Sequence, residues 1–221
     1  MKKLSVGTAF LFVALAAGSA HGAPIFVADF DNEVSNSAPY VASDFNGFSQ
    51  FDVADGTVDL VVGFHNGAGV ACPGNTGGCV DLDGSSGNAG IMTSKAAISF
   101  QPGFDYMLSL VLSGSRRGSA TETDTVEIRI LNGILATQSV TKAPSEGYET
   151  YSYAFTVASN TSGQIQIENL GGDNIGLLLD SVTLTEVASS TAVPLPATLP
   201  LLAAGLGLLG YAGRRKKAAS L

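Results

Sequence analysis

Apolar and polar residues alternate in short segments along most of the chain, and residues 24–192 show no sustained 3.6-residue apolar period. Val126, Ile128 and Ile130 alternate with charged residues, and residues 151–157 repeat the pattern with aromatic side chains. A period of two with one apolar face is typical of a half-buried antiparallel strand. Similar segments lie near residues 26–30, 47–53, 57–64, 78–83, 90–100, 104–113, 134–141, 163–170 and 175–186.

Turn-forming residues separate most of these segments, as at residues 101–103, 131–133 and 144–147. Ten or so short strands in one domain of about 165 residues favour a two-sheet antiparallel sandwich of the jelly-roll kind. A closed barrel is the alternative. The sequence therefore predicts an all-β body.

Two longer apolar runs occupy the ends of the chain. Lys2 and Lys3 precede an uncharged run from Leu4 to Ala20 that is followed by small residues. This is the layout of a secretory signal peptide, so we assign residues 1–23 to one and expect signal peptidase to cut between Ala20 and Ala23. The alternative is an N-terminal membrane anchor that is retained.

The second run, residues 195–213, is uncharged and would form a helix about 28 Å long, which is enough to cross a bilayer. Its flank is basic and consists of Arg214, Arg215, Lys216 and Lys217. Positive charge on one side and an acidic body on the other place the tail in the cytoplasm and the body outside it.

A short proline motif precedes this second run, and it consists of Val193, Pro194, Leu195, Pro196 and Ala197. Together with the apolar run and the basic tail it resembles the PEP-CTERM sorting signal in its VPLPA variant, over residues 193–221. The resemblance implies export across the inner membrane of a Gram-negative bacterium. It also implies cleavage by an exosortase-type enzyme and release to the cell surface or the extracellular polysaccharide matrix. The commoner motif has Glu where this chain has Leu195, which leaves the sortase variant open, and a permanent single-span anchor is the alternative.

The body resembles the galactose-binding-like jelly-roll domains that often precede this signal. The segments that carry the resemblance are residues 79–85, 90–94, 103–106, 113–118 and 171–182. We place the domain at residues 24–187 and a linker at residues 188–192. The resemblance implies a sandwich of the type found in carbohydrate-binding modules, often with a structural calcium ion.

The net charge of -8 is unevenly distributed. Six of the 11 basic residues lie in the terminal segments, which carry no acidic residue, so the body holds 5 basic against 19 acidic residues. This composition excludes a coiled coil, an ordinary basic nucleic-acid binder and a zinc site built on several Cys and His. So acidic a body repels anionic polymers unless divalent cations bridge them.

Asp180 is the most informative acidic residue. If the last strand is regular, Asp180 shares a face with Leu178, Val182 and Leu184, and a buried carboxylate needs a donor or a cation. The jelly-roll resemblance suggests calcium, which takes six to eight oxygen ligands. The candidate ligands are Asp29, Asp31, Glu33, Asp81, Asp83 and Asp180. The alternatives for Asp180 are a bulge that turns it outward and hydrogen bonds to turn amides.

Cys72 and Cys79 flank a turn rich in Gly, Pro and Asn. In an exported chain with an even number of cysteines, a disulfide is the default expectation. A redox-active pair is the alternative, although the spacing exceeds the two-residue gap of thiol oxidoreductases.

Catalytic chemistry finds little support, because His65 is the single imidazole of the body and no Gly-x-Ser-x-Gly elbow occurs. The absence of Trp weakens the prediction that the protein binds sugars by aromatic stacking. We read Tyr151 and Tyr153 as core residues. The candidate glycan contacts are Tyr40, Tyr148, Arg116 and Arg117, and solvated loop charge is the alternative for the two arginines.

Together these features predict a non-enzymatic exported surface protein with a structural or adhesive role on extracellular polysaccharide. A carbohydrate-binding module with a specific glycan ligand is the first alternative. A polysaccharide-acting enzyme is the second. The expected partners are signal peptidase, an exosortase-type enzyme, the inner membrane and polysaccharide, and no nucleic acid.

Overall fold

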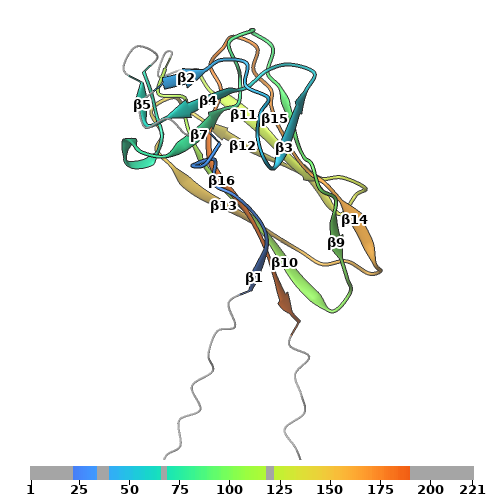
Figure 1. Cartoon of the computed structure of the whole chain (residues 1–221). Helices are drawn as coiled ribbons and strands as arrows, with labels where there is room; N and C mark the ends of the chain where they lie inside the picture. Colours follow the sequence, from blue (N-terminus) through green and yellow to red (C-terminus); the bar gives the residue numbers. More distant parts are fainter. Residues whose placement is uncertain (1–21, 34–39, 66–68, 118–121, 190–221) are drawn as a thin grey trace, which may run out of the picture. The chain divides into compact units, whose positions relative to one another are not determined.

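The computed structural model describes residues 22–33, 40–65, 69–117 and 122–189, and the sandwich in Figure 1 is built from these. The chain divides into two units, Met1–Ala188 and Ser189–Leu221. The predicted signal peptide lies almost entirely outside the described residues, as do the motif Val193–Ala197 and the basic tail Arg214–Lys217.

One sheet has seven strands. Across the sheet they are β13 (Glu149–Phe155), β10 (Phe104–Ser113), β16 (Leu178–Ala188), β7 (Gly78–Asp81), β4 (Asp59–Val62) and β2 (Tyr40–Ala42), with β1 (Ala23–Ala28) also paired to β16. The other sheet has five strands, which are β12 (Leu135–Lys142), β11 (Asp124–Ile130), β15 (Ile165–Asn169), β8 (Ile91–Ser94) and β3 (Phe51–Ala54). All of these pairings are antiparallel.

The chain crosses repeatedly between the two sheets, after one or two strands in each. After β3 in the smaller sheet come β4 and β7 in the larger one, then β8 in the smaller and β10 in the larger, and the alternation continues to β16. This confirms the prediction of an all-β, two-sheet antiparallel sandwich of the jelly-roll kind.

Alternation of side chains explains how the two sheets pack. On β10 the residues Tyr106, Leu108, Leu110 and Leu112 are all buried and face the core, whereas Met107 between them is 45% exposed. Val126, Ile128 and Ile130 of β11 supply the facing layer from the smaller sheet. The strand predictions at 104–113 and 126–130 follow from this period of two, and both strands form there.

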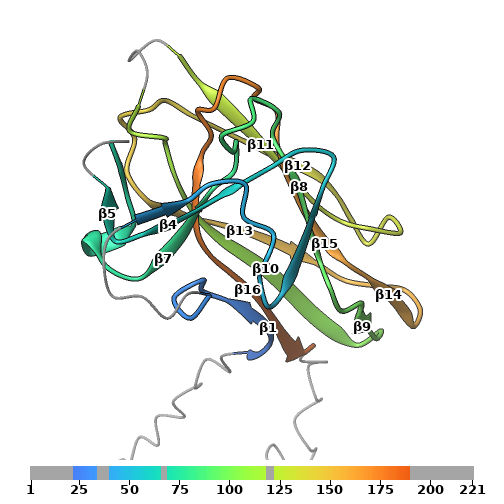
Figure 2. The ribbon, with the colours of Figure 1, turned by 45° about the horizontal axis from the view of Figure 1, so that its top comes forward.

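Several short elements lie outside the two sheets. They are β5 (Phe64–His65) paired with β6 (Val70–Ala71), β9 (Ile98–Phe100) paired with β14 (Thr161–Gly163), and the 3₁₀ turn η1 (Pro73–Asn75). Figure 2 shows β5 on one side of the sandwich, near β4 and β7. The predicted segment 90–100 is in fact two strands, β8 and β9, which pair with different partners.

A second, smaller apolar cluster lies on the outer face of the seven-stranded sheet. Leu60 and Val80 face the main core, so their neighbours on the same strands, Val61 and Cys79, face outward. Both are fully buried because the segment that contains β6 and Cys72 packs over them. Cys72 and Cys79 form the predicted disulfide, with a Cα–Cα distance of 5.5 Å.

Candidate functional site

A hollow of about 320 Å³ opens on the outer face of the seven-stranded sheet, beside this disulfide-linked segment. Strands β2, β4 and β7 supply its floor, and β5, β6 and the loop after β10 supply its walls. We name this hollow the Asp81 pocket. It is lined by Val41, Ser43, Asp59, Val61, His65, Val70, Asp81, Ser85 and Arg117.

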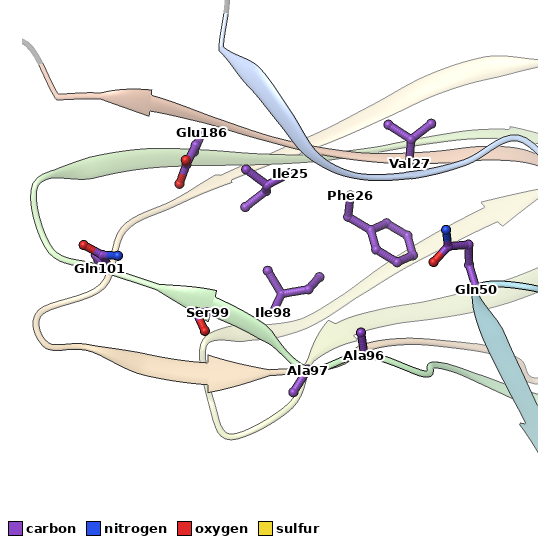
Figure 3. Close-up of a pocket in the computed structure, with 10 residues that line it drawn as sticks. All are labelled: Ile25, Phe26, Val27, Gln50, Ala96, Ala97, Ile98, Ser99, Gln101 and Glu186. Atoms are coloured by element: carbon purple, nitrogen blue, oxygen red, sulfur yellow. The ribbon is translucent and has the colours of Figure 1, made fainter.

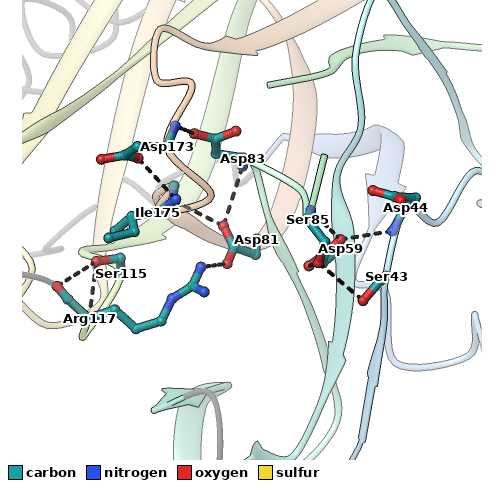
Figure 4. Close-up of polar contacts among 11 residues, drawn as sticks. Ser43, Asp44, Asp59, Asp81, Asp83, Ser85, Ser115, Arg117, Asp173 and Ile175 are labelled. Carbon is teal, nitrogen blue, oxygen red and sulfur yellow. Dashed lines mark hydrogen bonds and ion pairs between the residues drawn. The ribbon is translucent and has the colours of Figure 1, made fainter. Parts of the chain in front are cut away.

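Two buried carboxylates lie opposite each other in the floor of the Asp81 pocket. Asp59 on β4 and Asp81 on β7 are register partners, and they are 6% and 2% exposed. Like charges directly opposite each other destabilise a sheet, so each carboxylate needs its own partners. Asp59 accepts hydrogen bonds from the Asp44 amide at 2.8 Å, the Ser85 amide at 3.1 Å and the Ser85 hydroxyl at 2.7 Å (Figure 4).

Asp81 is held by a cation on one side and by backbone amides on the other. Its Oδ2 atom forms an ion pair with the guanidinium of Arg117. Its Oδ1 atom accepts hydrogen bonds from the amides of Asp83 at 3.3 Å and Gly176 at 3.2 Å (Figure 4). Burial raises the pKa of Asp81 to about 8; Arg117 opposes this rise and Asp59 adds to it.

Arg117 reaches the pocket from the loop after β10. The Ser115 hydroxyl fixes this loop, since it accepts from the Arg117 amide at 3.2 Å and donates to the Arg117 carbonyl at 3.1 Å. The Arg117 side chain is 24% exposed, so part of the guanidinium faces the pocket opening. Arg116, predicted together with it, is exposed and does not line the pocket.

The pair Asp81 and Asp83 fastens the loop at residues 171–176 to β7. Asp83 accepts a hydrogen bond from the Asp173 amide at 3.0 Å, and the Gly176 amide reaches Asp81. A β-carbon at Gly176 would lie 2.3 Å from the Asp83 nitrogen, so only glycine permits this approach. Both carboxylates thus accept hydrogen bonds from loop amides, a role that the sequence did not predict for them.

The six predicted calcium ligands separate into different places. Glu33 accepts from the Ser49 amide at 2.8 Å and the Ser49 hydroxyl at 2.9 Å, while Asp31 accepts from the Gly78 amide at 2.8 Å. Burial raises the pKa of Asp180, and Asp31 and Asp29 lie near enough to add to this rise. Among the described residues, no three or more His, Cys, Asp and Glu side chains are grouped so that they could hold a metal ion. The six therefore do not fit one calcium site, and calcium binding stays a prediction.

Strand β16 is not regular at Asp180. Ser181 pairs with Val111 and Leu179 pairs with Leu112, so Asp180 has no partner in the register and forms a β-bulge. The expectation that Asp180 shares one face with Leu178, Val182 and Leu184 is therefore wrong. The bulge leaves Asp180 half-buried, with its carboxylate 3.2 Å from the Ser181 hydroxyl.

The predicted aromatic glycan contacts contribute less to the pocket. Tyr148 packs against the cluster around the disulfide, and its hydroxyl donates to the Ala71 carbonyl at 3.0 Å. Burial raises the pKa of the Tyr148 hydroxyl. Tyr40 begins β2, and its side chain lies outside the described part of the chain. Tyr151 and Tyr153 pack against the core, as predicted.

A second hollow of about 500 Å³ lies at the edge formed by β1 and β9 (Figure 3). Ile25 and Ile98 face each other across it, while Gln101 and Glu186 lie towards one end. Its other lining residues are Phe26, Val27, Gln50, Ala96, Ala97 and Ser99. In contrast to the Asp81 pocket, it has no buried charged side chain in its lining.

The C-terminal segment indicates how the protein is sorted in the cell. Residues 192–216 match the PEP-CTERM protein-sorting motif. The chain carries a PEP-CTERM sorting signal. This confirms the resemblance found in the sequence and implies export, with membrane-anchored sorting before processing by an exosortase-type enzyme. Within the described residues no helix is long and apolar enough to cross a membrane, and the predicted span 195–213 lies outside them.

No curated protein matches this chain. Among solved structures, it is similar to the C-terminal CBM6 of LamC, a marine laminarinase from Zobellia galactanivorans, with 13% identity over 67% of this chain and 99% of that one and a TM-score of 0.41. It is also similar to the C-terminal family 22 carbohydrate-binding module of Clostridium thermocellum Xyn10B, with 16% identity over 70% and 94% of the two chains and a TM-score of 0.39. Both TM-scores are below 0.5, so the fold assignment rests on the strand pairing described above and no function is taken from these similarities.

Proposed function

We propose that this chain is an exported, exosortase-processed surface protein whose sandwich binds a neutral sugar unit of extracellular polysaccharide in the Asp81 pocket. Binding of this kind would give the protein the structural or adhesive role expected from its sequence. The observation that carries the proposal is the pocket itself, in which fixed acceptors and the partly exposed side chain of Arg117 surround one small hollow. The PEP-CTERM motif supports the cellular location.

The polar groups of the pocket match the chemistry of sugar hydroxyls. A hydroxyl both donates and accepts, so it can bridge the carboxylate of Asp59 or the hydroxyls of Ser43 and Ser85 to the guanidinium of Arg117. These groups are pre-oriented, because the Ser85 hydroxyl already donates to Asp59 at 2.7 Å and lies 3.1 Å from the Ser43 hydroxyl, from which it can accept. Preorganised polar groups reduce the entropy that binding costs.

The size of the pocket limits the ligand. Its volume of about 320 Å³ is near the lower end of the range for small-molecule sites. Val41, Val61 and Val70 supply an apolar part of the lining against which the carbon face of a sugar ring can pack. A pocket of this size suits the end or a side branch of a polysaccharide better than the middle of a chain.

The charge of the protein favours a neutral ligand. The body carries 19 acidic residues against 5 basic ones. Of the basic side chains, Arg117, Arg129, Lys142 and Lys95 each lie within 4.0 Å of a carboxylate. An anionic polysaccharide would therefore meet net repulsion, whereas a neutral one would not.

Binding to a panel of neutral and anionic polysaccharides and their oligosaccharides tests the proposal. We expect binding to one class of neutral glycan and about fivefold weaker binding after Ser43→Ala, since one exposed hydroxyl contact is worth about 1 kcal/mol. Gln101→Ala in the second hollow is the matched control and should bind like the wild type. Binding to no neutral glycan, or binding lost in Gln101→Ala but kept in Ser43→Ala, would overturn the assignment of this pocket.

Processing is tested separately. Mass spectrometry of the mature protein from the producing cells should show a chain that lacks Arg214–Lys217. A mature chain that keeps these residues would contradict removal of the C-terminal segment and favour a permanent anchor. This result would leave sugar binding by the sandwich unaffected.

A further inference from the structure

A group of polar side chains that the sugar proposal does not use surrounds Gly171. It consists of Asp83 after β7, Asp124 at the start of β11 and Asn169 at the end of β15. A β-carbon on Gly171 would lie 2.6 Å from Asn169 Nδ2, 2.7 Å from Asp83 Oδ2 and 3.5 Å from Asp124 Oδ1. We name these three side chains the Gly171 group. They come from three separate strands or strand ends, so the fold and not the local sequence assembles them.

Buried polar atoms in the Gly171 group lack partners. Asn169 is 3% exposed, and neither its Oδ1 nor its Nδ2 atom has a hydrogen-bond partner among the described residues. Asp83 is fully buried, and its Oδ1 atom also has none there. Native proteins rarely leave buried polar atoms unsatisfied, so such atoms point to a bound ion or water.

The surroundings of the Gly171 group are strongly negative. Burial raises the pKa of Asp124 to about 6, and Asp173, Asp83 and Glu122 add to this rise against the opposing effect of Arg117. Asp83 is itself affected by burial and by Asp173, which raise its pKa, while amides of the 173–175 turn lower it. Carboxylates that repel one another in a buried place are stabilised by a cation between them.

We propose that the Gly171 group, Asp83, Asp124 and Asn169, binds a calcium ion. Carboxylate and side-chain amide oxygens are the ligands that calcium takes, and a 180° turn of the Asn169 amide exchanges its oxygen and nitrogen positions. The group supplies two carboxylates and one amide, and backbone carbonyls and water complete the coordination shell of calcium in such sites. Glycine at position 171 removes the side chain that would otherwise fill the space between these groups.

This site differs from the one expected from the sequence. That expectation combined Asp180 with Asp29, Asp31, Glu33, Asp81 and Asp83. The Gly171 group keeps only Asp83 of these six and adds Asp124 and Asn169. The proposal also does not depend on sugar binding, because none of the Gly171 group lines the Asp81 pocket.

Thermal melting of the purified full-length protein at pH 7.5, in EDTA and in calcium chloride, tests the site, and calorimetric titration with calcium gives its affinity and stoichiometry. At a calcium concentration of 100 times the dissociation constant, the unfolding equilibrium constant should fall about 100-fold. For a chain of this size this corresponds to a rise in melting temperature of about 5–10 °C. No rise and no binding heat would overturn the proposal.

Three variants assign the effect to residues. Asn169→Leu removes both partnerless amide atoms, so in EDTA it should melt no lower than the wild type, but it should lose the calcium shift. Asp124→Asn should weaken calcium binding at least tenfold. Asp180→Asn, away from the Gly171 group, is the control and should keep the full shift. A shift that persists in Asn169→Leu, or one that disappears in Asp180→Asn, would contradict this location of the ion.

Discussion

Replacing Asp81 by Asn should change how the stability of the protein depends on pH. Burial raises the pKa of Asp81 to about 8, although Arg117 opposes the rise, whereas the same side chain in the unfolded chain titrates near 3.8. Between these two values the folded protein holds a proton that the unfolded chain has released. Stability from this group is therefore complete below pH 3.8 and is lost as the pH rises towards 8.

The size of this effect follows from the number of protons involved. One proton bound only by the folded state changes the free energy of unfolding by about 1.4 kcal/mol per pH unit. From pH 5 to pH 7 the wild type should thus lose about 3 kcal/mol through Asp81. Asp81→Asn keeps a side-chain oxygen as acceptor for the Gly176 amide and has no proton to lose.

Urea unfolding of the wild type and Asp81→Asn at pH 5, 6 and 7, in EDTA, measures this difference. We expect the difference in stability between the variant and the wild type to move in favour of the variant by about 3 kcal/mol between pH 5 and pH 7. The pH dependence contributed by Asp124 is present in both proteins, so it cancels when their free energies of unfolding are subtracted. Parallel curves, with the variant about 3–5 kcal/mol less stable throughout, would refute the reasoning and show that Asp81 stays ionised as the partner of Arg117.

Three further predictions concern the scaffold of the site, each measured by urea or thermal unfolding. The double variant Cys72→Ser, Cys79→Ser should lose about 2.5 kcal/mol, because the disulfide closes a short loop in the unfolded chain; an unchanged stability would show that packing alone holds this loop. Gly114→Ala should lose about 1–3 kcal/mol, since its β-carbon would lie 2.0 Å from a backbone oxygen, whereas Gly147→Ala, with nothing within 4 Å, should be neutral. Lys142→Met should change stability by less than about 1 kcal/mol, because the carboxylate partner of this buried lysine is exposed and stays solvated; a loss above about 3 kcal/mol would contradict this.

The period-two pattern predicted the core strands well because burial between two sheets imposes that period directly. β10 and β11 show it most clearly, where Leu108 and Ile128 face inward and the alternate positions, such as Met107 and Arg129, face outward. The two-residue strands β5 and β6 were not separable by pattern, because a period needs more residues to become visible.

Asp180 shows where regular alternation misleads. The sequence from Leu178 to Leu184 reads as an uninterrupted strand. The bulge at Asp180 becomes visible only against the partner strand β10, because it is a property of the pairing between Val111 and Leu112. The alternative of an outward bulge, considered from the sequence, is the one that the pairing supports.

The Asp81 pocket could not be derived from alternation alone, because it lies on the face that alternation assigns to solvent. Asp59 and Asp81 occupy outward positions on β4 and β7, where charged residues are ordinary in an exposed sheet. The feature of the sequence that indicates a covered face is the residue type at the neighbouring outward positions. These positions hold Val61 and Cys79, which are unfavourable in water. Apolar residues on both faces of a strand predict that another segment packs over the outer face. The cysteine predicts that this segment is a disulfide-linked loop. Two carboxylates on a covered outer face need hydrogen-bond donors or a cation. Arg117 and Ser85 supply these in the structure.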